Sequence, residues 1–173
     1  MNIDYATPQV IDNFLPKEEF DKLLDRIICK NFPWYISDVS DYHGDNNTQL
    51  FHILYKNNLP NSDYFSDFQY IYNKLNIFAL YKVRLIATLK DNGKPNQFHS
   101  DIGTIPLNKV NSKTAVYYIN DNDGGTEFEN NEFIKSQSNR MVIFDSKLKH
   151  RTVKHKTGDV YRYVLNLNYV KIE

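Results

Sequence analysis

A chain of 173 residues with 41% apolar residues is long enough to bury a substantial core and predicts one domain. Its net charge of zero gives no electrostatic reason to expect nucleic acid or an anionic membrane as a partner. Cys29 is the single cysteine, no apolar run approaches membrane-spanning length, and the N-terminus lacks a signal-like segment. We therefore expect a soluble cytoplasmic protein.

The first part of the chain predicts two helices among short strands. A strand and turn over Gln9 to Leu15 precede an amphipathic helix from Lys17 to about Lys30, in which apolar residues recur at helical spacing. Two strands are expected next, at Trp34 to Ile36 and Leu50 to Tyr55. A second helix is predicted from Ser62 or Asp63 to Leu75, with an apolar stripe of its own.

From Tyr81 onward every segment is strand-like. The strand Tyr81 to Lys90 is followed by a turn, Asp91 to Asn96, that leads to His99. The later predicted strands are Lys113–Ile119, Thr126–Glu129, Glu132–Lys135, Arg140–Phe144, Thr152–His155 and Tyr161–Val170. Two helices and then many short strands indicate an α+β domain. Closing the strands as a double-stranded β-helix, or jelly roll, leaves few exposed edges.

We accordingly expect one domain over residues 1–173. Residues 1–80 would supply helices that pack on one sheet, and residues 81–173 would form the jelly-roll core.

The stretch Phe98-His99-Ser100-Asp101 is the first candidate site. Side chains two positions apart in an extended segment point to the same side, so His99 and Asp101 would be presented together. With a distant second histidine they match the facial triad of non-haem Fe(II) oxygenases. An isolated H-x-D pair is more often a polar turn at the end of a strand. His150 is preferred as the third ligand because it follows the strand Met141 to Phe144 directly, although spacing does not exclude His155.

Arg162 is the second candidate, in the strongly β segment Tyr161 to Tyr169, where Asn168 shares its face. If that face lines the interior of the barrel, Arg162 needs an anion, because an unpaired buried charge is costly. A guanidinium group binds a carboxylate through two parallel hydrogen bonds. Tyr118 is placed in the same way, and its hydroxyl would reach the same carboxylate. A solvent-facing arginine and a core tyrosine are the structural alternatives.

Four spaced elements follow one another between Lys82 and Tyr169. They are Phe98-His99-Ser100-Asp101, Thr114 to Asn120 with Gly124-Gly125, Asn139 to Phe144 with His150, and Gly158 with Arg162-Tyr163. In this order they resemble the 2-oxoglutarate- and Fe(II)-dependent dioxygenases, and most of all the prolyl-4-hydroxylase-like branch with its small phage-type members.

The resemblance implies a ligand for each candidate. His99, Asp101 and His150 would bind Fe(II), and Arg162 would bind the distal carboxylate of 2-oxoglutarate. No catalytic residue is implied beyond the metal centre, and ascorbate is a further cofactor that the resemblance allows.

Three more residues are predicted to contact the cosubstrate. Tyr118 takes the place of a family tyrosine that helps to bind it. Asn168 lies on the face of Arg162, and Leu89 stands about where some prolyl hydroxylases have another tyrosine.

The implied reaction is hydroxylation of a C–H bond with molecular oxygen, which releases succinate and carbon dioxide. The substrate would be a peptidyl proline or a small molecule. Halogenating relatives have a small residue at the position of Asp101, so this carboxylate favours hydroxylation. The candidate substrate loops are Ile102 to Ser112, as a lid, Ser37 to Asn47, and Asp145 to Lys149.

Two alternatives to a hydroxylase remain. A nucleic-acid demethylase would share the triad, but such enzymes carry a second arginine where this chain has Asn168. A non-catalytic metal-binding jelly roll is the other alternative.

Overall fold

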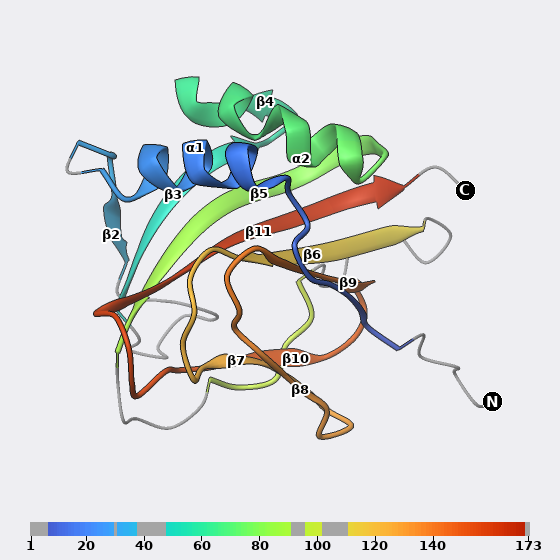
Figure 1. The fold of residues 1–173 in the computed structure, drawn as a ribbon. Helices are drawn as coiled ribbons and strands as arrows, with labels where there is room; N and C mark the ends of the chain where they lie inside the picture. Colours follow the sequence, from blue (N-terminus) through green and yellow to red (C-terminus); the bar gives the residue numbers. More distant parts are fainter. Residues whose placement is uncertain (1–6, 30, 38–47, 91–95, 102–110, 172–173) are drawn as a thin grey trace.

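A computed structural model of the chain describes residues 7–29, 31–37, 48–90, 96–101 and 111–171. The strands form two sheets, and the helices cover the outer face of the larger one (Figure 1). Most of three predicted loops, Ser37 to Asn47, Asp91 to Asn96 and Ile102 to Ser112, lies outside the described residues.

The larger sheet has eight strands, in the order β1-β9-β6-β11-β5-β3-β2 with β4 also paired to β3. Every pair in it is antiparallel. The strands are β1 (Gln9–Ile11), β2 (Tyr35–Ser37), β3 (Gln49–Lys56), β4 (Leu59–Pro60), β5 (Ile77–Leu89), β6 (Ser112–Tyr118), β9 (Arg140–Asp145) and β11 (Tyr161–Lys171). The N-terminal part of the chain thus supplies the strands predicted there, now β1, β2 and β3, together with the short β4 and the start of β5.

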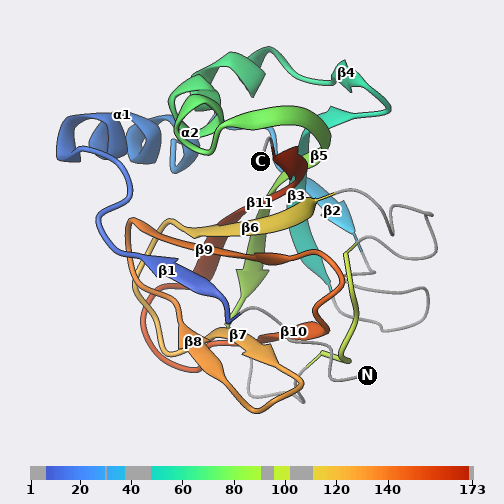
Figure 2. The same ribbon diagram turned by 90° about the vertical axis from the view of Figure 1, so that its right-hand side faces the viewer.

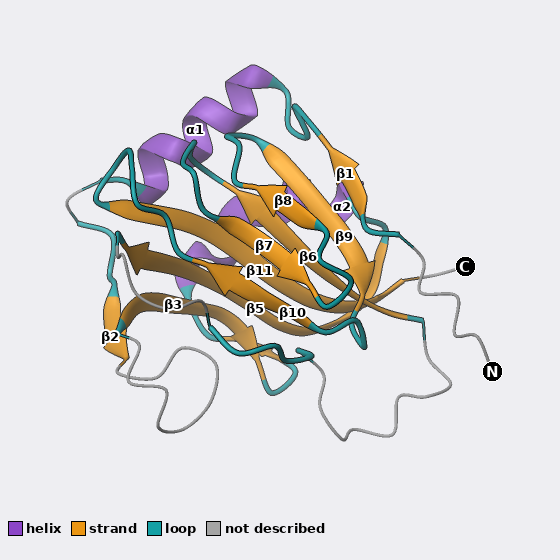
Figure 3. Cartoon of the chain, turned by 90° about the horizontal axis from the view of Figure 1, so that it is seen from below, coloured by secondary structure: helices purple, strands orange, loops and turns teal. Residues whose placement is uncertain are grey.

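The smaller sheet has three strands in the order β10-β7-β8, also antiparallel. They are β7 (Gly125–Phe128), β8 (Phe133–Lys135) and β10 (His150–Val153). They lie on the side of the larger sheet opposite the helices (Figure 2), and the chain is seen from this side in Figure 3. The strand β10 begins at His150, two residues before its predicted start, so His150 is part of a strand and not of the preceding loop.

The helical layer consists of α1 (Lys17–Ile27), a 3₁₀ segment η1 (Asp63–Phe68) and the short α2 (Gln69–Lys74). The second predicted helix is therefore only partly α-helical. It ends before Asn76, which has a φ of 52°, because a left-handed residue cannot continue a right-handed helix. Within the described residues, none of the helices is both long and apolar enough to cross a membrane.

The larger sheet separates two apolar clusters. The outer cluster joins the buried faces of the helices to one face of the sheet, and Leu23, Ile27, Leu85, Leu165 and Leu167 belong to it. The inner cluster lies between the two sheets and includes Ile86, Val116, Phe128, Phe144 and Val164.

Alternation along β5 and β11 explains this division, since successive side chains point to opposite faces of a sheet. The two sheets, with helices packed on one of them, confirm the predicted α+β jelly roll. The same alternation sends the polar residues of β5 and β11 to the inner face.

Candidate metal centre

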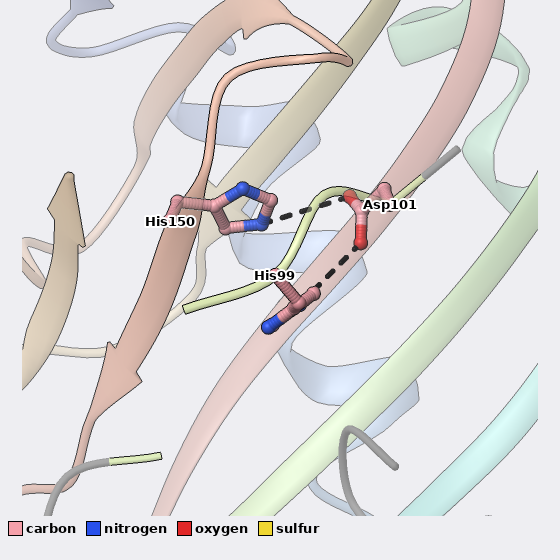
Figure 4. Close-up of side chains that lie close together, drawn as sticks. All are labelled: His99, Asp101 and His150. Carbon is pink, nitrogen blue, oxygen red and sulfur yellow. Dashed lines mark ion pairs between the residues drawn. The ribbon is translucent and has the colours of Figure 1, made fainter. Parts of the chain in front are cut away.

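Three predicted ligands meet between the two sheets. The ligand atoms of His99, Asp101 and His150 all lie within 4.8 Å of one another. Nε2 of His99 is 3.8 Å from Oδ1 of Asp101, and Nε2 of His150 is 3.8 Å from its Oδ2. Figure 4 shows the two imidazole rings and the carboxylate arranged in this way.

Backbone pairing brings the two histidines together. His99 and His150 exchange two N–H···O=C hydrogen bonds of 2.9 Å, so the segment with His99 extends the smaller sheet beside β10. This pairing explains how residues 51 positions apart have ring centroids separated by 4.8 Å.

Hydrogen bonds set the tautomers of both rings. Nδ1–H of His99 donates to the carbonyl oxygen of Gln97 at 3.2 Å, and Nδ1–H of His150 donates to that of Leu148 at 3.0 Å. A carbonyl can only accept, so Nδ1 carries the proton and Nε2 keeps its lone pair in the neutral ring. Metal-binding histidines in proteins are oriented in the same way.

The larger sheet holds Asp101. Its Oδ2 accepts hydrogen bonds from the side-chain amides of Asn168 at 2.9 Å and Asn166 at 3.3 Å, both on β11. Burial by itself would raise the pKa of Asp101, but the nearby His150, Arg84 and Asn168 outweigh burial and lower it to about 2. Asp101 is therefore a carboxylate at neutral pH, as a metal ligand has to be.

This donor set fits an iron ion. Two imidazoles and one carboxylate are the ligands of the facial triad. The alternative third ligand, His155, is not part of the cluster. It is buried elsewhere, and its Nε2 bonds to the carbonyl oxygen of Asp159 at 3.0 Å.

A cavity adjoins the three ligands on the inner face of the larger sheet. Besides the ligands themselves, its lining includes Arg84, Thr88, Thr126, Arg162 and Asn166. Nε of Arg84, Oγ1 of Thr88 and Oδ1 of Asn166 are buried without a hydrogen-bond partner in the described part of the chain. Because buried polar atoms are nearly always hydrogen-bonded, this grouping indicates a site for a polar ligand.

Arg162 lies at the cavity, as predicted from the inward face of β11. The residue is 2% exposed, and its Nη1 donates to the carbonyl oxygen of Gly125 at 2.9 Å. The strand β7 approaches its neighbour closely here, because a Cβ atom on Gly125 would collide with the carbonyl oxygen of Ile134. The guanidinium group is thus held at a defined place in the cavity wall.

Tyr118 lies beside Arg162 but is not among the residues that line the cavity. Its hydroxyl donates to Oγ1 of Thr126 at 2.7 Å, and its ring centre is 5.9 Å from the guanidinium carbon of Arg162. Burial raises the pKa of this hydroxyl, which therefore stays protonated. In this arrangement Tyr118 orients Thr126, which lines the cavity.

The structure does not bring Leu89 to the site. Its side chain is 39% exposed, on the opposite face of β5 from the cavity-lining Thr88. Strand alternation accounts for this, since Leu89 shares the face of Leu85 and Ala87.

Arg84 is a site residue that sequence reasoning missed. It is the cross-strand partner of Asn166 on β11 and shares a face with Ile86 and Thr88. The available signal was strand alternation, which places Arg84 on the face opposite Leu85 and Ala87; only the structure showed that this face meets the inward face of β11.

No family model and no curated protein sequence matches the chain. Solved structures do match. A 2OG-Fe(II) oxygenase family oxidoreductase from Burkholderia pseudomallei aligns with a TM-score of 0.65 and 11% identity, over 96% of this chain and 86% of that one. A viral collagen prolyl hydroxylase from Paramecium Bursaria Chlorella virus-1, solved with 2OG, aligns with a TM-score of 0.58 and 18% identity, over 96% of each chain.

A small-molecule enzyme has the same fold. The non-heme alpha ketoglutarate dependent carbocyclase SnoK from nogalamycin biosynthesis aligns with a TM-score of 0.64 and 11% identity, over 95% of this chain and 79% of that one. The comparisons confirm the fold that the sequence motifs predicted. This chain has the fold of the 2-oxoglutarate- and Fe(II)-dependent oxygenases, prolyl hydroxylases among them.

Proposed function

We propose that the protein is an Fe(II)- and 2-oxoglutarate-dependent hydroxylase in which His99, Asp101 and His150 bind the iron. The convergence of these three side chains on the inner face of a double-stranded β-helix carries the proposal. When bound, iron and 2-oxoglutarate supply the oxidation of a C–H bond by molecular oxygen, with release of succinate and carbon dioxide.

The chain's own residues would prepare this centre. The carbonyl oxygens of Gln97 and Leu148 hold the histidine rings with Nε2 toward Asp101. The amides of Asn166 and Asn168 fix the carboxylate. Such preorganisation lowers the cost of assembling the site, because the ligands need not be reoriented when the metal binds.

Arg162 is proposed to bind the distal carboxylate of 2-oxoglutarate. It is the buried cation at the end of the cavity where Thr88, its cross-strand partner, has an unpartnered hydroxyl in the described part of the chain. Tyr118 would act here through Thr126, which lines the same cavity and accepts its hydrogen bond. Asn168 would serve the site through Asp101, to which it donates.

The substrate is proposed to be a peptidyl proline or a small molecule. Structural neighbours of both kinds share the fold, the viral collagen prolyl hydroxylase and the carbocyclase SnoK. Asp101 supports hydroxylation, because the halogenating relatives implied by the sequence resemblance would have a small residue at this position.

An anaerobic titration with Fe(II) and 2-oxoglutarate tests the cofactor pair. We expect a visible metal-to-ligand charge-transfer band in the parent protein and none in His99→Ala. A folded parent protein without the band would contradict the proposal and favour a non-catalytic module.

Arg162→Met tests the cosubstrate assignment in the same titration. Because the substitution removes a charged carboxylate partner, we expect 2-oxoglutarate affinity to fall by at least about tenfold while Fe(II) affinity is retained. His155→Ala is the matched control for the histidines and should leave the band intact. Equal loss of both ligands in Arg162→Met would mean that the arginine supports the fold and not the cosubstrate.

A further inference from the structure

A second arginine faces the cavity beside the metal ligands. Arg84 lines the same cavity as the triad, and its Nε is buried without a partner within the described residues. It forms no ion pair with an acidic side chain in the described part of the chain, and Asp101 in the same cavity is paired with His99 and His150. The side chain is half-buried, and within the described residues its guanidinium group lacks a direct anionic partner.

This arginine is too far along the sheet to share the distal carboxylate with Arg162. Arg84 pairs with Asn166, which is four residues from Arg162 on β11, a separation of about 13 Å along a strand. The four carbon–carbon bonds of 2-oxoglutarate, each about 1.5 Å, span at most about 6 Å. The hydrogen bond from Arg162 to the carbonyl oxygen of Gly125 also fixes its guanidinium group beside β7.

A lysine adds to the positive charge of Arg84 on the inner face of β5. Lys82 is on the same face of β5 as Arg84 and pairs with Asn168, which contacts Asp101. Burial and the neighbouring Arg84 lower the pKa of Lys82 to about 8. Two cations therefore lie close together on one strand, which is unfavourable unless an anion joins them.

The charges of the assembled metal centre do not balance the positive charges of Arg84 and Lys82. An iron(II) ion, the Asp101 carboxylate, a 2-oxoglutarate dianion and the Arg162 guanidinium together sum to zero. The positive charges of Arg84 and Lys82 are then in excess, although they lie at the level of the metal ligands where the reacting substrate has to bind.

Building on the function proposed above, we infer that the primary substrate carries an anionic oxygen group, a carboxylate first of all, that binds Arg84 with support from Lys82. A guanidinium group recognises carboxylates through paired hydrogen bonds. This assignment favours a small organic acid over an internal peptidyl proline, whose amide carbonyl is neutral.

The test uses the protein loaded with Fe(II) and saturating 2-oxoglutarate without oxygen, so that Arg162 is already occupied. The probes are N-acetyl-L-proline, its neutral amide N-acetyl-L-prolinamide, and inorganic sulfate, and binding is measured by calorimetry and by the change in the charge-transfer band. We expect an anionic probe to bind at least about tenfold more tightly than the amide, because a charge-assisted contact is gained.

Variants assign the preference to Arg84. Arg84→Met should abolish it and Arg84→Lys should retain part of it, whereas Arg26→Met removes a positive charge from the exposed surface of α1 and should change nothing. An intact charge-transfer band in each variant shows that the site is folded. Sulfate binding without binding of the acid, lost in Arg84→Met, also supports the inference and points to a sulfate or phosphate ester.

Three results would overturn the inference. Equal affinity for the acid and the amide, with no sulfate binding, would show that the cations do not select an anion. An anion preference that survives in Arg84→Met would place the anion elsewhere. Weaker Fe(II) binding in Arg84→Met, without a change in anion binding, would mean that Arg84 serves only to balance Asp101. A missing band in the parent is different, because it refutes the hydroxylase itself.

Discussion

The two faces of the strand β11 carry different kinds of side chain. On the outer face, Leu165 and Leu167 are fully buried against the helical layer. On the inner face, Arg162, Asn166 and Asn168 are buried too, but they face the cavity or the candidate metal ligands. The outer face thus supplies apolar area that stabilises the fold, and that stability supports buried polar groups on the inner face.

A substitution on the outer face should have the largest effect on stability. Leu165→Ala would leave a cavity in the outer cluster, and we expect a loss of about 3 kcal/mol in the free energy of unfolding. Urea denaturation measures it. A loss below about 1 kcal/mol would mean that the outer cluster is loosely packed, and the contrast between the faces would weaken.

A substitution on the inner face should affect the metal more than the fold. Asn168→Ala removes the 2.9 Å hydrogen bond to Asp101, so Fe(II) affinity is expected to fall about tenfold or more. An anaerobic Fe(II) titration measures it, and Asn166→Ala, which removes the longer contact, is the graded comparison. If both variants bind iron like the parent, the amides do not position the carboxylate.

The positive charge of Lys82 on the inner face should lower the stability of the ligand-free protein, unlike the apolar side chains of the outer face. Its pKa is lowered to about 8 in the folded protein, so the folded state binds fewer protons than the unfolded state between about pH 8 and the ordinary lysine pKa. Stability therefore rises with pH through that window.

Removal of the charge in Lys82→Met should stabilise the ligand-free protein at pH 7 by about 1 kcal/mol, after allowance for solvent screening. It should also flatten the rise above pH 8. Urea midpoints from pH 7 to 10.5 measure both effects, and a variant less stable than the parent at pH 7 would contradict the prediction.

Leu89→Ala should have the smallest effect. Because Leu89 is exposed and faces away from the cavity, we expect 2-oxoglutarate affinity to stay within about twofold of the parent. Thr88→Ala is the matched variant on the inner face and should weaken the binding of 2-oxoglutarate. Reversal of the two results would show that the inner and outer faces of β5 have been exchanged.

Local patterns were sufficient for the fold and for the individual site candidates. Alternating residues predicted most strands, helical spacing predicted α1, and the H-x-D pair with His150 named the side chains that the structure brings together. These features depend on neighbours along the chain, where geometry is nearly constant.

The tertiary structure decided which residues of neighbouring strands lie opposite one another. The family resemblance placed Leu89 and Tyr118 at the cosubstrate. Strand alternation turns Leu89 outward, and the hydroxyl of Tyr118 bonds to Thr126 in the cavity lining. Register also brought Arg84 opposite Asn166, beside Asp101, where no motif indicated it. A shift of one residue exchanges the two faces of a strand. Which face is inward follows only from the hydrophobic layers that enclose the sheet on both sides.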